Sequence, residues 1–226
     1  MEPIPFQPFN PRAAMSLYRR NLPHWRQEGG TYFVTFRLAD SIPRSVGLAW
    51  EAERRIWLAA HGVGAGLGAS EFATKYAAIA ERERRAFERR FAHRLHAELD
   101  RGHGECLLSR PKIRAALADA LHHFDGARCR CGDWVIMPNH VHWLVAPQRG
   151  WKLEGLLSSI KGFVSVQATR LGAKAGRLWQ SESHDHLVRN RAELAAFRKY
   201  IAENPGKARL AAGRFAVWQA EWDVEG

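Results

Sequence analysis

Met137-Pro138-Asn139-His140-Val141-His142 is the stretch around which the sequence is organised. Apolar residues fill 134–136 before it and 143–145 after it, and a Pro-Asn turn between two apolar runs predicts two strands joined by a tight connection. Side chains alternate between the faces of a strand, so His140 and His142 share a face and Val141 lies on the other. Two adjacent imidazoles suit two ligands of one metal ion, and we favour this over two half-buried histidines that only cap a sheet.

The composition favours a globular, basic protein. The 226 residues are 46% hydrophobic and 11% aromatic, which is enough for a real core. The formal net charge is +11 with a pI of about 10.2, so the first expected partner is a polyanion, usually nucleic acid. We expect no membrane contact, because there is no apolar run of spanning length and no signal peptide, and we expect a cytoplasmic location. The three cysteines form neither a disulfide framework nor a zinc knuckle.

The expected organisation is one domain over residues 31–210, with an N-terminal arm of little structure over 1–30 and a C-terminal tail over 211–226. The clearest strand is 31–38, which is rich in β-branched and aromatic residues. A helical insertion is expected at about 45–102, as two helices joined by the Gly-rich link 62–68, the second running from Ser70 to near Gly102. Further elements are expected as a helix after Pro111, a strand before the histidine pair, a helix over 153–171, a short strand over 186–188 and a helix from near Arg191.

The last predicted helix supplies a possible partner for the histidine pair. Tyr200 and Asn204 are four residues apart and share a helical face, and Pro205 should end the helix at its exposed end. Taken singly, each has a plain alternative, a core tyrosine and a C-terminal cap. The other three tyrosines lie in the arm, on the first strand and on an apolar helical stripe. A nearby cation, together with Arg198 and Lys199, would favour the Tyr200 phenolate.

Basic residues mark possible DNA contacts. The second predicted insertion helix carries arginines opposite its apolar stripe, and this face is either simply solvated or a ridge that contacts DNA. The candidate DNA-binding residues in the whole chain are Arg37, Arg85, Arg89, Arg90, Lys161, Arg189, Arg198 and Lys199.

Five segments in this order resemble the single-tyrosine HUH transposases, and within them the REP-associated tyrosine transposases. They are 30–35, 137–142, 178–180, 185–189 and 200–205. The resemblance implies an α+β fold: a ferredoxin-like antiparallel sheet with helices on one face, an inserted helical hairpin, and a C-terminal helix that carries the tyrosine. It implies Tyr200 as the nucleophile, His140, His142 and Asn204 as metal ligands, and a 5′-phosphotyrosyl linkage. The chain departs from the family at 183–184, where Ser-His replaces the usual aromatic.

The chemistry fits these residues independently. A tyrosine that attacks a phosphodiester needs a polarised non-bridging oxygen, which a divalent metal supplies as a Lewis acid. Two imidazoles and an amide oxygen suit Mn²⁺, and Mg²⁺ would serve if phosphate and water complete its shell. A covalent intermediate conserves bond energy for rejoining strands.

We therefore predict metal-dependent nicking and strand transfer on single-stranded or hairpin DNA from hairpin-forming repeats, by a monomer or homodimer. One alternative is a non-catalytic DNA-binding protein on the same fold, which the intact set of four site residues disfavours. The other is a metal-dependent hydrolase that uses bound water and does not need Tyr200. The lack of a general-base carboxylate near the histidine pair disfavours that reading.

Overall fold

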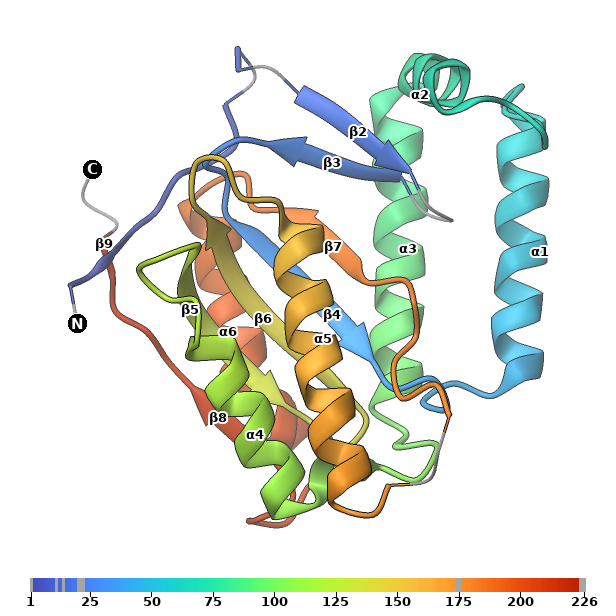
Figure 1. The fold of residues 1–226 in the computed structure, drawn as a ribbon. Coiled ribbons are helices and arrows are strands. Elements are labelled where there is room, and N and C mark those ends of the chain that lie inside the picture. Colours follow the sequence, from blue (N-terminus) through green and yellow to red (C-terminus); the bar gives the residue numbers. More distant parts are fainter. Residues whose placement is uncertain (1, 11, 14, 20–22, 174–175, 224–226) are drawn as a thin grey trace.

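A five-stranded antiparallel sheet forms the centre of the computed structural model, which describes residues 2–10, 12–13, 15–19, 23–173 and 176–223 (Figure 1). Among these residues the strand order is β7-β4-β6-β5-β8. The bounds are β4 Tyr32–Arg37, β5 Cys129–Ile136, β6 His140–Pro147, β7 His184–Leu187 and β8 Ala216–Trp218. Every neighbouring pair in this sheet is antiparallel, as the sequence predicts.

The chain passes through the first four of these strands in the βαββαβ order of a ferredoxin-like fold. Helix α4 (Pro111–His122) connects β4 to β5, and α5 (Leu153–Arg170) connects β6 to β7. Both helices pack on one face of the sheet, where they form the larger hydrophobic core (Figure 1). The predicted α+β fold is therefore confirmed.

Helix α6 (Arg191–Lys207) covers the opposite face and forms a second core with it. The alternation along β6 explains how one strand serves both cores. Val141, Trp143 and Val145 point into the α4–α5 core, whereas Leu144 points into the α6 core. His140 and His142 have the same parity as Leu144, so they lie beneath α6.

The insertion contains three helices rather than the predicted hairpin: α1 (Arg44–Ala60), α2 (Ala69–Ala78) and α3 (Glu81–Leu99). The second predicted helix breaks because Ile79 and Ala80 are extended, with ψ near 137° and 129°. Ile79 is buried with Leu58, Phe72 and other apolar side chains of α1 and α2. Burial of Ile79 therefore turns the chain, and α3 continues separately toward the sheet.

The two ends of the chain are more ordered than expected. β1 (Ile4–Pro5) pairs in parallel with β9 (Trp222–Asp223), and β2 (Met15–Arg19) forms a hairpin with β3 (Pro23–Gln27). The expectation of an arm with little structure is thus wrong for these residues, and the predicted tail supplies β8 and β9. Residues 1, 11, 14, 20–22 and 224–226 of the arm and tail lie outside the described residues. None of the described helices is both long and apolar enough to cross a bilayer.

Candidate catalytic site

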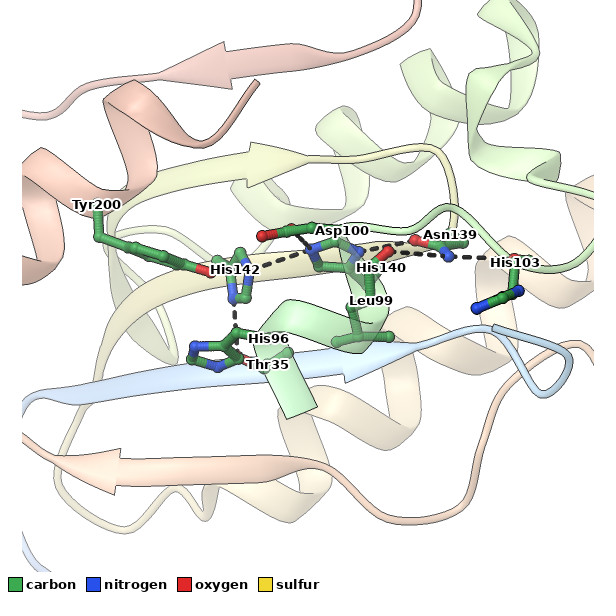
Figure 2. Close-up of polar contacts among 9 residues, drawn as sticks. All are labelled: Thr35, His96, Leu99, Asp100, His103, Asn139, His140, His142 and Tyr200. Carbon is green, nitrogen blue, oxygen red and sulfur yellow. Dashed lines mark hydrogen bonds and ion pairs between the residues drawn. The ribbon is translucent and has the colours of Figure 1, made fainter. Parts of the chain in front are cut away.

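His140 and His142 face each other beneath α6. Both side chains are fully buried, and their Nε2 atoms lie 3.1 Å apart (Figure 2). Burial lowers the pKa of His140 to about 3. Burial, followed by the neighbouring histidines, holds the pKa of His142 well below its usual value. Both imidazoles are therefore neutral at pH 7, as metal ligands must be.

Asn139 fixes the orientation of the first imidazole. Its amide nitrogen donates to the carbonyl oxygens of Leu99 at 3.3 Å and His103 at 3.1 Å, so its Oδ1 faces Nδ1 of His140 at 2.8 Å. An amide oxygen can only accept, so Nδ1 of His140 carries the proton and its Nε2 lone pair is free. The Pro-Asn pattern in the sequence indicates only a turn at Asn139.

Thr35 plays the corresponding part for the second imidazole. It lies directly opposite His142 in the β4–β6 register, and its Oγ1 is 2.8 Å from Nδ1 of His142. When Nδ1 donates to this hydroxyl, the Nε2 lone pair of His142 faces that of His140 across 3.1 Å. Such an arrangement is favourable with a cation between the two nitrogens, because bare lone pairs repel each other.

Tyr200 lies on α6, which packs over the histidine pair of β6. Its hydroxyl is 3.3 Å from Nε2 of His142, and its ring is stacked on His96 with a centroid distance of 5.3 Å. Burial raises the pKa of Tyr200, the nearby carboxyl of Asp100 raises it further, and Asn204 lowers it. Tyr200 is thus a neutral phenol here, and its ionisation requires a cation or a proton acceptor.

Asn204 is completely buried, and neither its oxygen nor its nitrogen makes a hydrogen bond of normal geometry with the described residues. It lies close enough to Asp100 and Tyr200 to lower the pKa of both. The prediction that Pro205 ends the helix at an exposed end is wrong, because α6 continues to Lys207. Asn204 is therefore not a terminal cap. A buried amide that makes no hydrogen bond of normal geometry can cost up to about 1–3 kcal/mol, so a ligand beside Asn204 would be favourable.

The insertion contributes two side chains to the site from the end of α3. His96 Nε2 is 3.4 Å from Thr35 Oγ1, and Oδ1 of Asp100 is 4.0 Å from Nε2 of His140 (Figure 2). Burial is the main cause of both pKa shifts: the pKa of His96 is lowered to about 3, and that of Asp100 is raised. The expectation that the site lacks a carboxylate is therefore wrong. Their spacing of four residues is the available signal, but the sequence pattern predicts for this helix only a solvated face or a ridge that contacts DNA.

The predicted ligand set has the donor atoms that a divalent cation can use. Among the described residues, no cluster of three or more His, Cys, Asp or Glu side chains has metal-binding geometry. The predicted set differs, since it contains two imidazoles and an amide. Two cis ligands with bonds of about 2.0–2.2 Å lie about 3 Å apart, which fits the 3.1 Å between the imidazole nitrogens. The buried amide of Asn204, which makes no hydrogen bond of normal geometry with the described residues, has the chemistry of a third ligand.

The predicted DNA-binding residues do not form one surface. Arg85, Arg89 and Arg189 line a cavity between the insertion and β7, whereas Lys161 lies on α5, which covers the other face of the sheet. Lys199 is on α6, with an exposed side chain 3.7 Å from Glu203. Arg89 is exposed and makes no ion pair or hydrogen bond with the described residues.

Three of these basic residues have internal partners. Arg198 donates to the fully buried Asp133 at 3.0 Å and to the carbonyl of Ala220, so its charge is directed away from Tyr200. The expectation that Arg198 favours the Tyr200 phenolate is therefore wrong. Arg37 is half-buried, donates to Ser41 at 3.1 Å, and has its pKa lowered to about 10 by burial. Arg90 lies 3.4 Å from Glu53 of α1.

The sequence matches the model of no known protein family, and no curated protein sequence matches it. Its structure is similar to a solved structure described as that of a REP-associated tyrosine transposase bound to a REP hairpin. The two sequences are 20% identical, and the match covers 85% of this chain and 74% of the other with a TM-score of 0.41. At this degree of likeness, function has to be inferred from the site itself.

Proposed function

We propose that the protein nicks single-stranded DNA and transfers the cut strand through a covalent bond to Tyr200, in a reaction that depends on a divalent metal. One observation carries the proposal: a tyrosine hydroxyl lies 3.3 Å from one of two neutral imidazoles whose Nε2 atoms face each other. The five sequence segments that resemble the single-tyrosine HUH transposases support the same reading.

His140, His142 and Asn204 would hold the metal, Mg²⁺ or Mn²⁺. When bound, it supplies Lewis-acid polarisation of a non-bridging phosphate oxygen. In the reaction the Tyr200 oxygen forms a bond to phosphorus, and the bond from phosphorus to the 3′ oxygen of the preceding nucleotide breaks. The products are a 5′-phosphotyrosine and a free 3′-hydroxyl, so a second attack by a 3′-hydroxyl rejoins a strand and releases the tyrosine.

The protein side chains prepare Tyr200 for this attack. The ring is held by His96 on one side and by the edge of Phe33, whose centroid is 6.0 Å away. A fixed ring keeps the hydroxyl in line with a bound phosphate and removes much of the entropic cost of attack. The carboxyl of Asp100 lies in the electrostatic surroundings of Tyr200, which makes it a candidate acceptor for the phenolic proton.

The proposed substrate follows from charge and from the sequence resemblance. A net charge of +11 favours a polyanion, and the resemblance points to hairpin-forming repetitive DNA. The internal partners of Arg37 and Arg198 mean that we no longer propose these two as phosphate contacts. Arg89, Arg90 and Lys199 remain the proposed contacts with exposed side chains.

Asp100 also favours a second candidate, a metal-dependent hydrolase. A carboxylate beside a metal site can act as general base toward a bound water, and Tyr200 would then have no covalent part. The two candidates differ in one product, because only the first leaves protein attached to DNA.

The test uses single-stranded hairpin DNA labelled at either end, incubated with the protein and Mn²⁺ and then separated on a denaturing gel. The proposal expects a labelled protein–DNA adduct from the 3′-labelled substrate and a free cleaved fragment from the 5′-labelled one. Cleavage of both substrates without an adduct would identify the protein as a hydrolase. If neither Mn²⁺ nor Mg²⁺ supports cleavage, the remaining reading is a non-catalytic DNA-binding protein.

A further inference from the structure

A cavity of about 540 Å³ lies between the insertion and the edge strand β7. This volume is within the range of about 300–1,000 Å³ that is usual for ligand sites. Its walls carry aromatic rings from several elements: Trp57 of α1, Phe87 and Phe91 of α3, and Trp25 of β3. Trp57 and Phe87 are stacked, with centroids 4.2 Å apart and planes 12° from parallel.

The inner end of this cavity adjoins the candidate catalytic site. His96 lines the cavity and also stacks on Tyr200. Phe33 lines it as well, and its ring is stacked between His142, at 5.4 Å, and Phe197, at 4.2 Å. A molecule in the cavity would therefore lie beside a phosphate held at Tyr200.

The charges at the cavity favour an anionic ligand with flat rings. Three of its acidic side chains are engaged: Glu81 with Arg85, Glu88 with the Tyr76 hydroxyl, and Glu193 with His186. The guanidinium of Arg84 lies over the Trp25 ring at 5.5 Å. Arg89 makes no ion pair with the described residues, so its charge is available to bind a phosphate. Stackable rings beside arginines are how proteins bind unpaired nucleotides.

We propose that this cavity binds the unpaired nucleotides next to the phosphate at Tyr200, with a base against the aromatic walls and a backbone phosphate at Arg89. The inference rests on the proposed function, because it takes DNA as the substrate. Base pairing covers the edges of bases and stacking covers their faces, so a duplex has no free base to insert. The insertion would thereby select a strand with an unpaired flank.

Binding of three DNA hairpins tests the role of the bases. The three kinds are a hairpin without a flank, a hairpin with a short unpaired flank, and a hairpin with an abasic flank of the same length. Each flanked kind is made once with the flank on the 5′ side and once with it on the 3′ side. The full-length chain with Tyr200→Phe measures binding without a covalent step. We expect the normal flank on one side to tighten binding about 5-fold to 100-fold per stacked base, and the abasic flank to give much less. If the abasic flank tightens binding as much as the normal flank does, the proposal is overturned.

Two variant pairs test the cavity itself. Trp57→Leu should remove the gain from the bases, while Phe163→Leu, at an exposed ring on α5 outside the cavity, should keep it. Arg89→Gln should reduce the slope of log binding constant against log salt concentration by about 0.7, and only for flanked DNA. Arg82 is exposed on the same helix but lies outside the cavity, so Arg82→Gln should not change this slope. Because Arg89 is exposed and makes no ion pair or hydrogen bond with the described part of the chain, this pair remains decisive even if Trp57→Leu unfolds. An unchanged slope for Arg89→Gln would overturn the phosphate site.

The outcomes separate this inference from the proposed function. If an adduct forms on Tyr200 but the flank adds nothing to affinity, the cavity proposal fails and the enzyme proposal stands. If the flank tightens binding through Trp57 and Arg89 but no adduct forms, the cavity binds DNA as proposed and the covalent mechanism fails.

Discussion

The hydroxyl of Tyr200 lies 3.3 Å from Nε2 of His142, across the contact between α6 and the sheet. This nitrogen also faces Nε2 of His140 at 3.1 Å, so the phenol lies beside the proposed metal position. Packing of α6 on the sheet thus sets the distance between the nucleophile and the proposed metal site.

Replacing Tyr200 by Phe removes one oxygen and keeps the ring that stacks on His96. We expect the fold, Mn²⁺ affinity and hairpin affinity to remain and the covalent adduct to disappear, as judged on a denaturing gel. Tyr76→Phe is the control for loss of a phenol elsewhere, since Tyr76 lies in the small core of the insertion. If Tyr200→Phe nicks DNA at an undiminished rate, the nucleophile is a bound water and not Tyr200.

Replacing His140 by Ala removes one of the two facing nitrogens. We expect cleavage to be lost and Mn²⁺ affinity, measured by calorimetry, to fall at least 10-fold, while hairpin affinity changes little. His123→Ala is the matched control, because His123 is exposed at the end of α4. An equal loss of hairpin binding in His140→Ala would make the histidine pair structural.

Replacing Asn204 by Leu separates a metal ligand from a structural amide. The buried amide makes no hydrogen bond of normal geometry with the described residues, so its removal should leave the metal-free stability unchanged or raise it by about 1 kcal/mol. The rise in melting temperature on adding Mn²⁺ should be lost. Thermal melting with and without Mn²⁺ measures both effects, and an unchanged Mn²⁺ response would exclude Asn204 as a ligand.

The buried histidines predict a loss of stability in acid. The pKa values of His96 and His140 are about 3 in the folded protein, against 6.5 for an ordinary imidazole. The unfolded chain therefore takes up protons that the folded chain does not, and stability falls as the pH drops from about 6.5 toward 3. Each group contributes at most about 1.4 kcal/mol per pH unit in this window.

Urea unfolding between about pH 7 and pH 4 measures this slope. His96→Gln should reduce it by removing one of the titrating groups, whereas His123→Gln at the surface should leave it as it is. If the free energy of unfolding is flat across this range for the unmodified chain, the histidines are not held neutral.

Arg198→Ala should act on stability rather than on DNA binding. Among the residues that the structure describes, it leaves the fully buried Asp133 with two donors, the Trp222 indole at 2.7 Å and the Ala220 amide at 3.2 Å. Breaking a buried ion pair typically costs about 3–5 kcal/mol, and we expect the lower end here. Lys199→Ala, at an exposed neighbour, should be neutral in urea unfolding. A normal stability with a flattened salt slope of DNA binding would restore Arg198 as a phosphate contact.

The sheet and the histidine pair were predictable because their signals are local. The i, i+2 spacing on a strand fixes the shared face of His140 and His142, and apolar alternation fixes the strands around them. The spacing of Tyr200 and Asn204 placed both on one side of α6 in the same way. Local periodicity does not reveal which distant elements meet, so Thr35 was not predicted even though it lies opposite His142.

The insertion was predicted least well, for two physical reasons. The break at Ile79 has no Gly or Pro to mark it and depends on burial against α1, which is a tertiary effect. The position of His96 and Asp100 beside the histidine pair depends on how α3 docks, which Asn139 helps to set by bonding to Leu99 and His103. The pairing of Arg198 with Asp133 likewise spans 65 residues of chain.

The wide separation of the site residues along the chain has a consequence for biosynthesis. Thr35, His96, His142 and Tyr200 come from four elements, and α6 is the last helix of the described residues to be translated. A ribosome-bound chain that has not yet released α6 holds the paired imidazoles but no attacking hydroxyl. The proposed DNA-cutting activity therefore begins only after α6 has been translated and has packed on the sheet.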